Sequence, residues 1–199
     1  MSNINFKKIV ENLIDTFIYA GKVSLKLREK GLIKKIKSDN TPVSNGDLEV
    51  NEIITKKIFE LTPDIPIISE ETSDNKSIID LRNFWLIDPI DGTYDYINNL
   101  DEFTINAGLI IDRQPTAGLI YAPAKERMFY SYGKELEFEK KGGEIIKLDC
   151  SKYFNKNEIK FVSYSNNLKP EIKKKHEEFK VKKFKRMKSS LKFCVIAAG

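Results

Sequence analysis

The sequence Phe-Trp-Leu-Ile-Asp-Pro-Ile-Asp-Gly-Thr occupies residues 84–93 and passes from an apolar run into a compact group of polar residues. The apolar run predicts a short strand that ends at Asp88. Asp88 and Asp91 stand on either side of Pro89-Ile90, and Gly92 and Thr93 follow at once. Carboxylate oxygens are the ligands that Mg²⁺ prefers. The stretch therefore predicts a cation site at a strand end, and a structural Asp-Gly turn is the alternative.

A second acidic group, Glu70 and Glu71, follows another apolar stretch that predicts a strand over residues 65–69. Two adjacent carboxylates repel one another unless a cation lies beside them, although a pair of surface glutamates is the commoner meaning. Together with the acids of residues 88–91 they form a candidate metal cluster. Sites with two metal ions are typical of phosphoester hydrolysis.

A third motif covers residues 37–47, Lys-Ser-Asp-Asn-Thr-Pro-Val-Ser-Asn-Gly-Asp. Its polar character and its Thr-Pro pair predict a loop or short hairpin. Ser44 can cap a helix that runs to about Leu61, with Asp47 at the position of a capping box. Asp47 can therefore be only a helix-start residue, or it can belong to the candidate site.

The remaining patterns predict an α+β fold. Helical periodicity covers residues 5–30, with Gly31 as the stop, and residues 103–148 alternate between β-branched stretches and glycine turns, as in an antiparallel meander. Residues 159–163, 170–179 and 189–198 then predict a strand, a helix and the start of another helix. We expect one domain over residues 1–150 and a partial α/β domain over residues 151–199.

The order of the three motifs resembles the amino-terminal signature of the inositol monophosphatase superfamily. Within it, the details look most like the 3′(2′),5′-bisphosphate nucleotidases, on four features: Asp95, Glu102-Phe103-Thr104-Ile105-Asn106, Tyr121-Ala122-Pro123 and Ser189-Ser190-Leu191-Lys192-Phe193-Cys194. The resemblance implies the layered α/β/α/β sandwich of the sugar phosphatases, with its second α/β layer incomplete in this sequence.

The resemblance also implies roles for individual residues. Glu70, Asp88, the carbonyl of Ile90 and Asp91 would bind metal. Glu70, Ile90, Asp91, Gly92 and Thr93 would line the substrate site, with Gly92 and Thr93 holding the scissile phosphate. Thr93 and Asp47 would activate the attacking water. Glu71 would support the second shell around the metal ions or bind a third, weaker cation. Ser190 and Lys192 would lie near the nucleotide.

The implied reaction is removal of the 3′-phosphate of 3′-phosphoadenosine 5′-phosphate, with two or three Mg²⁺ ions and inhibition by Li⁺. An inositol-1-phosphate phosphatase and an inactive nucleotide-binding remnant are the alternatives. The sequence ends before the Trp-Asp-x-Ala segment of the family, whose Asp is a further metal ligand, so we expect a truncated chain. Gly46, where the family usually has Ala, is expected to be a mild change.

The composition bears on partners and location. The net charge is +5, but the lysines of residues 173–188 lack a nucleic-acid-binding motif, so a solvated face is expected and no nucleic-acid partner. No run approaches the roughly 20 apolar residues of a membrane span. We expect a cytoplasmic protein that can form a homodimer and can touch the inner face of the membrane peripherally.

Overall fold

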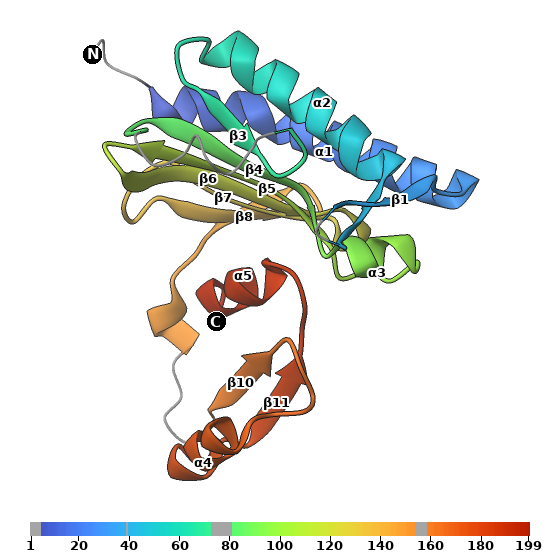
Figure 1. Ribbon diagram of the computed structural model, residues 1–199. Helices are drawn as coiled ribbons and strands as arrows, with labels where there is room; N and C mark the ends of the chain where they lie inside the picture. Colours follow the sequence, from blue (N-terminus) through green and yellow to red (C-terminus); the bar gives the residue numbers. More distant parts are fainter. Residues whose placement is uncertain (1–4, 39, 73–80, 154–158) are drawn as a thin grey trace.

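A seven-stranded sheet forms the centre of the protein in the computed structural model, which describes residues 5–38, 40–72, 81–153 and 159–199 (Figure 1). Its strand order follows the chain, from β3 to β9. The first two strands pair in parallel and the others antiparallel. The strands are β3 (Ile67–Ser69), β4 (Phe84–Asp91), β5 (Thr104–Ile111), β6 (Gln114–Ala122), β7 (Arg127–Ser131), β8 (Glu137–Lys141) and β9 (Glu144–Lys147). The predicted meander is confirmed.

Two helices, α1 (Phe6–Lys30) and α2 (Asn45–Leu61), lie side by side over one face of this sheet (Figure 1). Their apolar stripes pack on the alternate strand residues that point the same way, and the largest fully buried side chains here include Trp85, Phe17 and Phe103. The Asn5 side chain caps α1 by accepting from the Lys8 N–H, and Gly31 ends it with φ 94°. Both predicted helices are confirmed.

The opposite face of the sheet carries α5 (Leu191–Ala197). Along β6, residues Leu119 and Tyr121 face α1 and α2, whereas Ala122 joins Phe129, Leu191 and Cys194 in a second apolar cluster. Two long helices therefore cover one face of the sheet, and α5 packs on part of the other, as Figure 1 shows. Cys150 and Cys194 are both free thiols.

The other elements are short. The hairpin β1 (Lys34–Ile36) with β2 (Pro42–Ser44) precedes α2, as predicted. After the sheet, β10 (Lys160–Ser163) and β11 (Lys183–Arg186) pair in parallel around α4 (Pro170–Glu178). The elements β11 and α3 (Thr93–Ile97) were not predicted. The strand β11 lies in a run of basic residues that lacks the alternation of a strand, and α3 is too short, at five residues, to show a helical period. The 3₁₀ turns are Pro123–Lys125 and Cys150–Tyr153.

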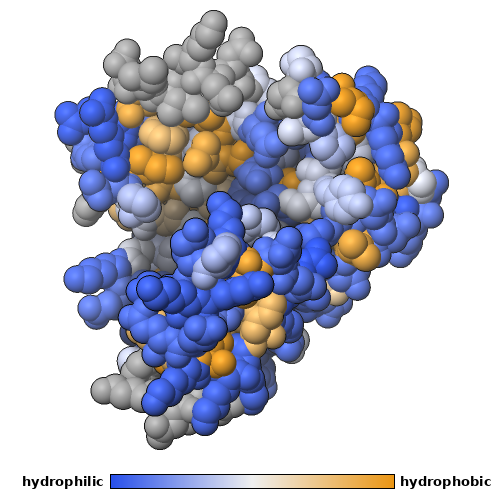
Figure 2. All heavy atoms as spheres, turned by 60° about the horizontal axis from the view of Figure 1, so that its bottom comes forward, coloured by the Kyte–Doolittle hydropathy of each residue, from blue (hydrophilic) through white to orange (hydrophobic). Residues whose placement is uncertain are grey.

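Hydrophilic side chains make up most of the surface in the lower part of Figure 2, and apolar side chains of the C-terminal elements such as Phe184 and Phe193 are exposed as well. Lys173, Lys174, Lys182 and Lys185 are exposed there. No helix in the described residues is both long and apolar enough to cross a membrane. The boundary near residue 150 stays a prediction.

Candidate active site

A β-bulge in β4 brings two acids of the candidate site to the same face of the sheet. Asp88 pairs with Asn106 and Asp91 with Thr104, so three steps along β4 match only two along β5. Residues three apart on a regular strand point to opposite faces, and the extra residue cancels this alternation. Pro89 suits the irregular position because it has no N–H to donate to the ladder. The bulge therefore places both carboxylates together while Ile90 stays in the core.

Asp88 carries an unusual carboxylate. Its Oδ1 atom is buried and, among the described residues, has no hydrogen-bond partner. Burial, and then the negative charges of Glu70 and Asp91, raise the pKa of Asp88 to about 8. A buried acid without a donor is costly unless it is protonated or a cation lies beside it. This is the electrostatic environment that a hard divalent cation would relieve.

The two glutamates lie at the carboxyl end of β3, which is parallel to β4. The Glu70 N–H donates to the Ile87 carbonyl at 3.1 Å, which holds this turn against β4. Lys37 reaches across from the β1–β2 hairpin, with its Nζ 2.8 Å from Glu71 Oε1 and 3.5 Å from Glu70 Oε1. Burial raises the pKa of Glu71 although Lys37 opposes the shift. Lys37 was part of the quoted motif, but no role was predicted for it.

The residues present fit a metal ion by their chemistry rather than by a preformed cage. Within residues 5–38, 40–72, 81–153 and 159–199, no group of three or more His, Cys, Asp or Glu side chains is arranged to hold an ion as it stands. Glu70 instead faces Lys37. The set of oxygen donors, with an Asp88 Oδ1 that has no partner among the residues that the structure describes, nevertheless suits Mg²⁺, which usually takes one or two carboxylates plus water and phosphate. The predicted metal ligands stay a prediction.

Thr93 and Asp47 are brought into contact although they are 46 residues apart in the sequence. The Thr93 hydroxyl lies 3.2 Å from Asp47 Oδ1 and 3.0 Å from the Ile90 carbonyl oxygen. Asp47 Oδ2 accepts from the backbone N–H and the hydroxyl of Ser44, which completes the capping box of α2. Asp47 therefore caps α2 with one oxygen and contacts Thr93 with the other, and its role in the candidate site stays a prediction. Burial raises its pKa against these hydrogen bonds.

Gly92 is required by the turn that follows β4. Its φ of 93° is left-handed, and a Cβ there would lie 2.9 Å from the Glu102 carbonyl oxygen. The chain then enters α3, which begins at Thr93. Gly92 and Thr93 thus sit beside the acids of β4, where a phosphate role was predicted for them.

Gly46 is not the mild change that we expected. A Cβ at Gly46 would lie 2.2 Å from Tyr96 Oη, and that hydroxyl is held by donating to the Ser24 carbonyl at 2.7 Å. Tyr96 is fully buried, so it has no room to move away.

We expect Gly46→Ala to lower the free energy of unfolding by roughly 1–3 kcal/mol, the usual cost of overpacking a tight core. Urea denaturation measures this. The matched control is Gly108→Ala, whose added Cβ would meet nothing closer than the Ile110 Cδ1 at 4.0 Å. If the two variants have the same free energy of unfolding, the Tyr96 side chain can move aside to admit the added methyl group.

The loop between β11 and α5 contacts the candidate site through Ser190. The Ser190 N–H donates to Asp91 Oδ2, and the Ser190 hydroxyl contacts Thr104 Oγ1 at 2.7 Å and Asn106 Oδ1 at 2.8 Å. Ser190 thus lies at the site, whereas the Lys192 ammonium donates to the Ser189 carbonyl at 2.8 Å. Sequence reasoning missed Lys188, whose ammonium donates to Asp95 Oδ1.

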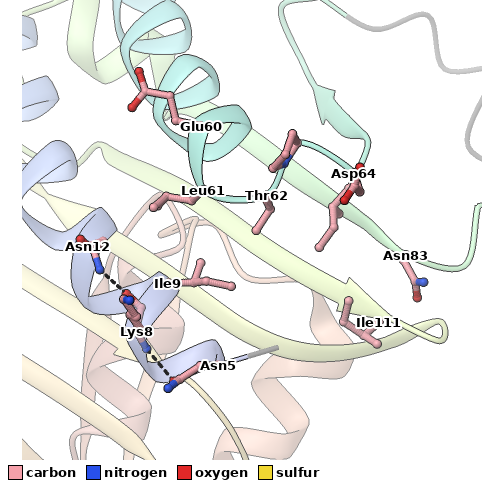
Figure 3. Close-up of a pocket in the computed structure, with 12 residues that line it drawn as sticks. Asn5, Lys8, Ile9, Asn12, Glu60, Leu61, Thr62, Asp64, Asn83 and Ile111 are labelled. Atoms are coloured by element: carbon pink, nitrogen blue, oxygen red, sulfur yellow. Dashed lines mark hydrogen bonds between the residues drawn. The ribbon is translucent and has the colours of Figure 1, made fainter. Parts of the chain in front are cut away.

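A separate cavity of about 740 Å³ lies where α1 begins and α2 ends (Figure 3). Its lining includes Asn5, Asn12, Glu60, Asp64 and Asn83. Asn83 precedes β4 and Ile111 ends β5, so this cavity is at the opposite end of these strands from Asp91. The predicted site residues are not among those that line it.

Comparison with curated proteins finds relatives that are named 3′(2′),5′-bisphosphate nucleotidase CysQ. The chain is 34% identical over 211 residues to the 3′(2′),5′-bisphosphate nucleotidase CysQ of Buchnera aphidicola, and the match covers 100% of this chain and 78% of that protein. It is 34% identical to the CysQ of Aggregatibacter actinomycetemcomitans over 70% of this chain, which is 53% of that relative. The prediction of a resemblance to bisphosphate nucleotidases is confirmed.

Solved structures agree on the fold. CysQ from Bacteroides thetaiotaomicron superposes with a TM-score of 0.71 at 23% identity, covering 99% of this chain and 79% of that chain. An IMPase/NADP phosphatase that was solved with Mg²⁺ and phosphate superposes with a TM-score of 0.72 at 15% identity, covering 98% and 69%. A model of the inositol monophosphatase family matches residues 7–199. The chain belongs to the inositol monophosphatase family, and the predicted α+β fold is confirmed.

Proposed function

We propose that the protein is a Mg²⁺-dependent phosphomonoesterase that hydrolyses 3′-phosphoadenosine 5′-phosphate to AMP and phosphate. The observation that carries this proposal is the buried Oδ1 of Asp88, which has no hydrogen-bond partner in the described part of the chain and lies beside the charges of Glu70 and Asp91, just before the Gly92–Thr93 turn. The names of the curated relatives support the nucleotide as substrate.

The residues predicted to hold the metal and the phosphate each have a place in this reaction. Glu70, Asp88, Asp91 and the Ile90 carbonyl oxygen would hold Mg²⁺, which when bound supplies positive charge to the phosphate and lowers the pKa of water. Gly92 and Thr93 hold the scissile phosphate.

Thr93 and Asp47 move the proton. The Thr93 hydroxyl accepts the proton of the attacking water as it passes its own proton to Asp47 Oδ1, 3.2 Å away. The water oxygen bonds to phosphorus as the bond from phosphorus to the ribose 3′-oxygen breaks, and the leaving oxygen takes up a proton from a solvent water. The raised pKa of Asp47 makes it a better proton acceptor than an ordinary aspartate.

Phosphate release measured with two substrates tests the proposal. We expect release from 3′-phosphoadenosine 5′-phosphate with Mg²⁺, its loss on chelation with EDTA, and inhibition by Li⁺. Preference for inositol 1-phosphate would favour the alternative phosphatase. Binding of the nucleotide in calorimetry without any phosphate release would favour the inactive remnant. A homodimer, a cytoplasmic location and a peripheral membrane contact stay predictions.

A further inference from the structure

The cavity between the start of α1 and the end of α2 is lined by three asparagines that are each held by a backbone contact (Figure 3). Asn5 Oδ1 accepts from the Lys8 N–H at 3.0 Å, and Asn83 Oδ1 accepts from the Asp112 N–H at 2.7 Å. Asn12 Nδ2 donates to the Lys8 carbonyl at 2.7 Å. Because a backbone N–H only donates and a carbonyl only accepts, these contacts fix which end of each amide is oxygen and which is nitrogen. The three side chains therefore have defined orientations.

The other half of each amide has no hydrogen-bond partner among the residues that the structure describes. Asn5 and Asn83 thus offer N–H donors, and Asn12 offers a carbonyl oxygen that accepts. In Figure 3, Asn5 and Asn12 stand on α1, whereas Asn83 lies across the cavity, just before β4. Asn83 is half-buried and the other two are exposed, so all three can exchange water for a ligand. A ligand in the cavity therefore meets donors and an acceptor from two sides.

The walls of the cavity are largely aliphatic. Ile9 of α1, Leu61 at the end of α2 and Ile111 at the end of β5 are half-buried there, together with Ile65. These side chains pack on the main core and keep part of their apolar surface toward the cavity. Covering such surface with an apolar ligand is favourable. The volume of about 740 Å³ lies within the range of roughly 300–1,000 Å³ that is usual for small-molecule sites.

The charges around the cavity favour neither an anion nor a cation. Lys8 is exposed and positive, and Asp64 is exposed and negative. Glu60 is neutralised by Lys57, whose Nζ lies 3.3 Å from Glu60 Oε2. The matching ligand is therefore neutral, with an apolar body and an edge that carries both acceptors and donors. The adenine ring has these properties, since its ring nitrogens accept and its amino group donates, and asparagine is a side chain that commonly reads this edge.

We propose that this cavity is a separate site that binds the adenine ring of a nucleoside. Asn5 and Asn83 donate to ring nitrogens, Asn12 accepts from the amino group, and the ring lies against the aliphatic walls. The site is at the opposite end of β4 and β5 from Asp91 and uses no metal ion, so it does not depend on the proposed function.

Calorimetry with adenosine in the presence of EDTA tests the proposal, because adenosine is uncharged. Asn5→Asp and Asn83→Asp keep the oxygen that accepts from the backbone N–H, so the cap of α1 and the contact with Asp112 remain and both proteins should fold. Each substitution replaces an N–H donor by an acceptor. We expect each to weaken adenosine binding by about tenfold or more, because a hydrogen bond is lost and two acceptors then face one another. Asn12→Leu, which removes the acceptor from an exposed position of α1, is expected to weaken binding by about three- to tenfold.

Asn45→Asp is the matched control. Asn45 Oδ1 likewise accepts from a backbone N–H, that of Ile33 at 2.9 Å, but Asn45 begins α2 and so lies at the other end of that helix from the cavity. The substitution adds the same charge and is expected to leave adenosine binding unchanged. Ribose, which lacks the base, is expected not to bind.

Several results would overturn the proposal. The unaltered protein could show no saturable binding of adenosine, or could bind ribose equally well, in which case the base is not what the cavity recognises. Unchanged affinity in both Asn5→Asp and Asn83→Asp would place adenosine elsewhere on the protein. An equal loss in Asn45→Asp would show that the added charge, rather than the lost donor, weakens binding. None of these results bears on the proposed function, which is tested by phosphate release.

Discussion

Asp88→Asn is expected to abolish Mg²⁺-dependent phosphate release and, at the same time, to raise the melting temperature of the metal-free protein. Activity should fall by about a thousandfold or more, because a catalytic metal ion supplies several kcal/mol of transition-state stabilisation. Stability should rise because the neutral amide removes a buried charge that lies beside Glu70 and Asp91 and whose Oδ1 has no donor among the described residues. About 1 kcal/mol corresponds to roughly 2–4 °C for a chain of this size.

The pH dependence of the metal-free protein gives this prediction a second, independent readout. The pKa of Asp88 is raised in the folded protein to about 8 from the usual 3.8. A raised pKa stabilises the fold at low pH, fully below the unfolded pKa, and that contribution is lost as the pH rises through the folded pKa. Asp88 therefore makes the metal-free protein less stable as the pH rises from 4 to 8.

The measurement is thermal unfolding of both proteins at pH 5 and pH 8.5, with EDTA and then with Mg²⁺. The gain in melting temperature from Asp88→Asn should be larger at pH 8.5 than at pH 5, and Mg²⁺ should stabilise only the unaltered protein. Asp64→Asn is the matched control, since Asp64 is an exposed acid far from this site, in the turn after α2. An equal gain at both pH values, or stabilisation of the variant by Mg²⁺, would contradict the role of Asp88.

Thr93→Val is expected to lower kcat by about 10²–10⁴-fold, the range for loss of a group that transfers a proton in the transition state. Valine keeps the shape of threonine but lacks the hydroxyl that lies 3.2 Å from Asp47 Oδ1 and 3.0 Å from the Ile90 carbonyl oxygen. The backbone N–H groups at the start of α3 stay in place, so KM should change much less than kcat. Steady-state rates of phosphate release from 3′-phosphoadenosine 5′-phosphate measure both constants.

Thr93→Ser is the control for this substitution, because serine retains the hydroxyl and should retain activity within about tenfold of the unaltered protein. A Thr93→Val protein that keeps most of its kcat would show that the hydroxyl carries no proton in the reaction. A variant that raises KM and leaves kcat unchanged would instead assign Thr93 to phosphate binding alone.

Much of the fold follows from local sequence patterns. The helices over residues 6–30 and 45–61 were predictable because their apolar residues recur at helical spacing, and Asn5 and Ser44 supply caps. The meander was predictable because its strands alternate with glycine turns. The short helix α3 was not, since its place depends on the left-handed Gly92 and on Tyr96 packing between α1 and the sheet rather than on any period.

The residues of the candidate site could also be selected from the sequence, from the acids of residues 70–71 and 88–91 and from the motif that ends at Asp47. Their arrangement in space could not be predicted. A three-residue spacing should send Asp88 and Asp91 to opposite faces of a strand, and only the pairing of β4 with β5 reveals the bulge that reunites them. Likewise, nothing local connects Lys37 with Glu71, or Asp47 with Thr93.

The sequence alone therefore determined the family, most of the helices and strands, and the acidic residues of the candidate site, because these depend on residue identity and local spacing. Only the tertiary structure decided that Asp88 Oδ1 is buried without a hydrogen-bond partner among the described residues, that Tyr96 fills the space that a side chain at Gly46 would need, and that the Lys188 ammonium contacts the Asp95 carboxylate. Each of these depends on contacts between residues 50 or more positions apart or on the burial that such contacts create, and such contacts are set by packing rather than by any pattern along the chain.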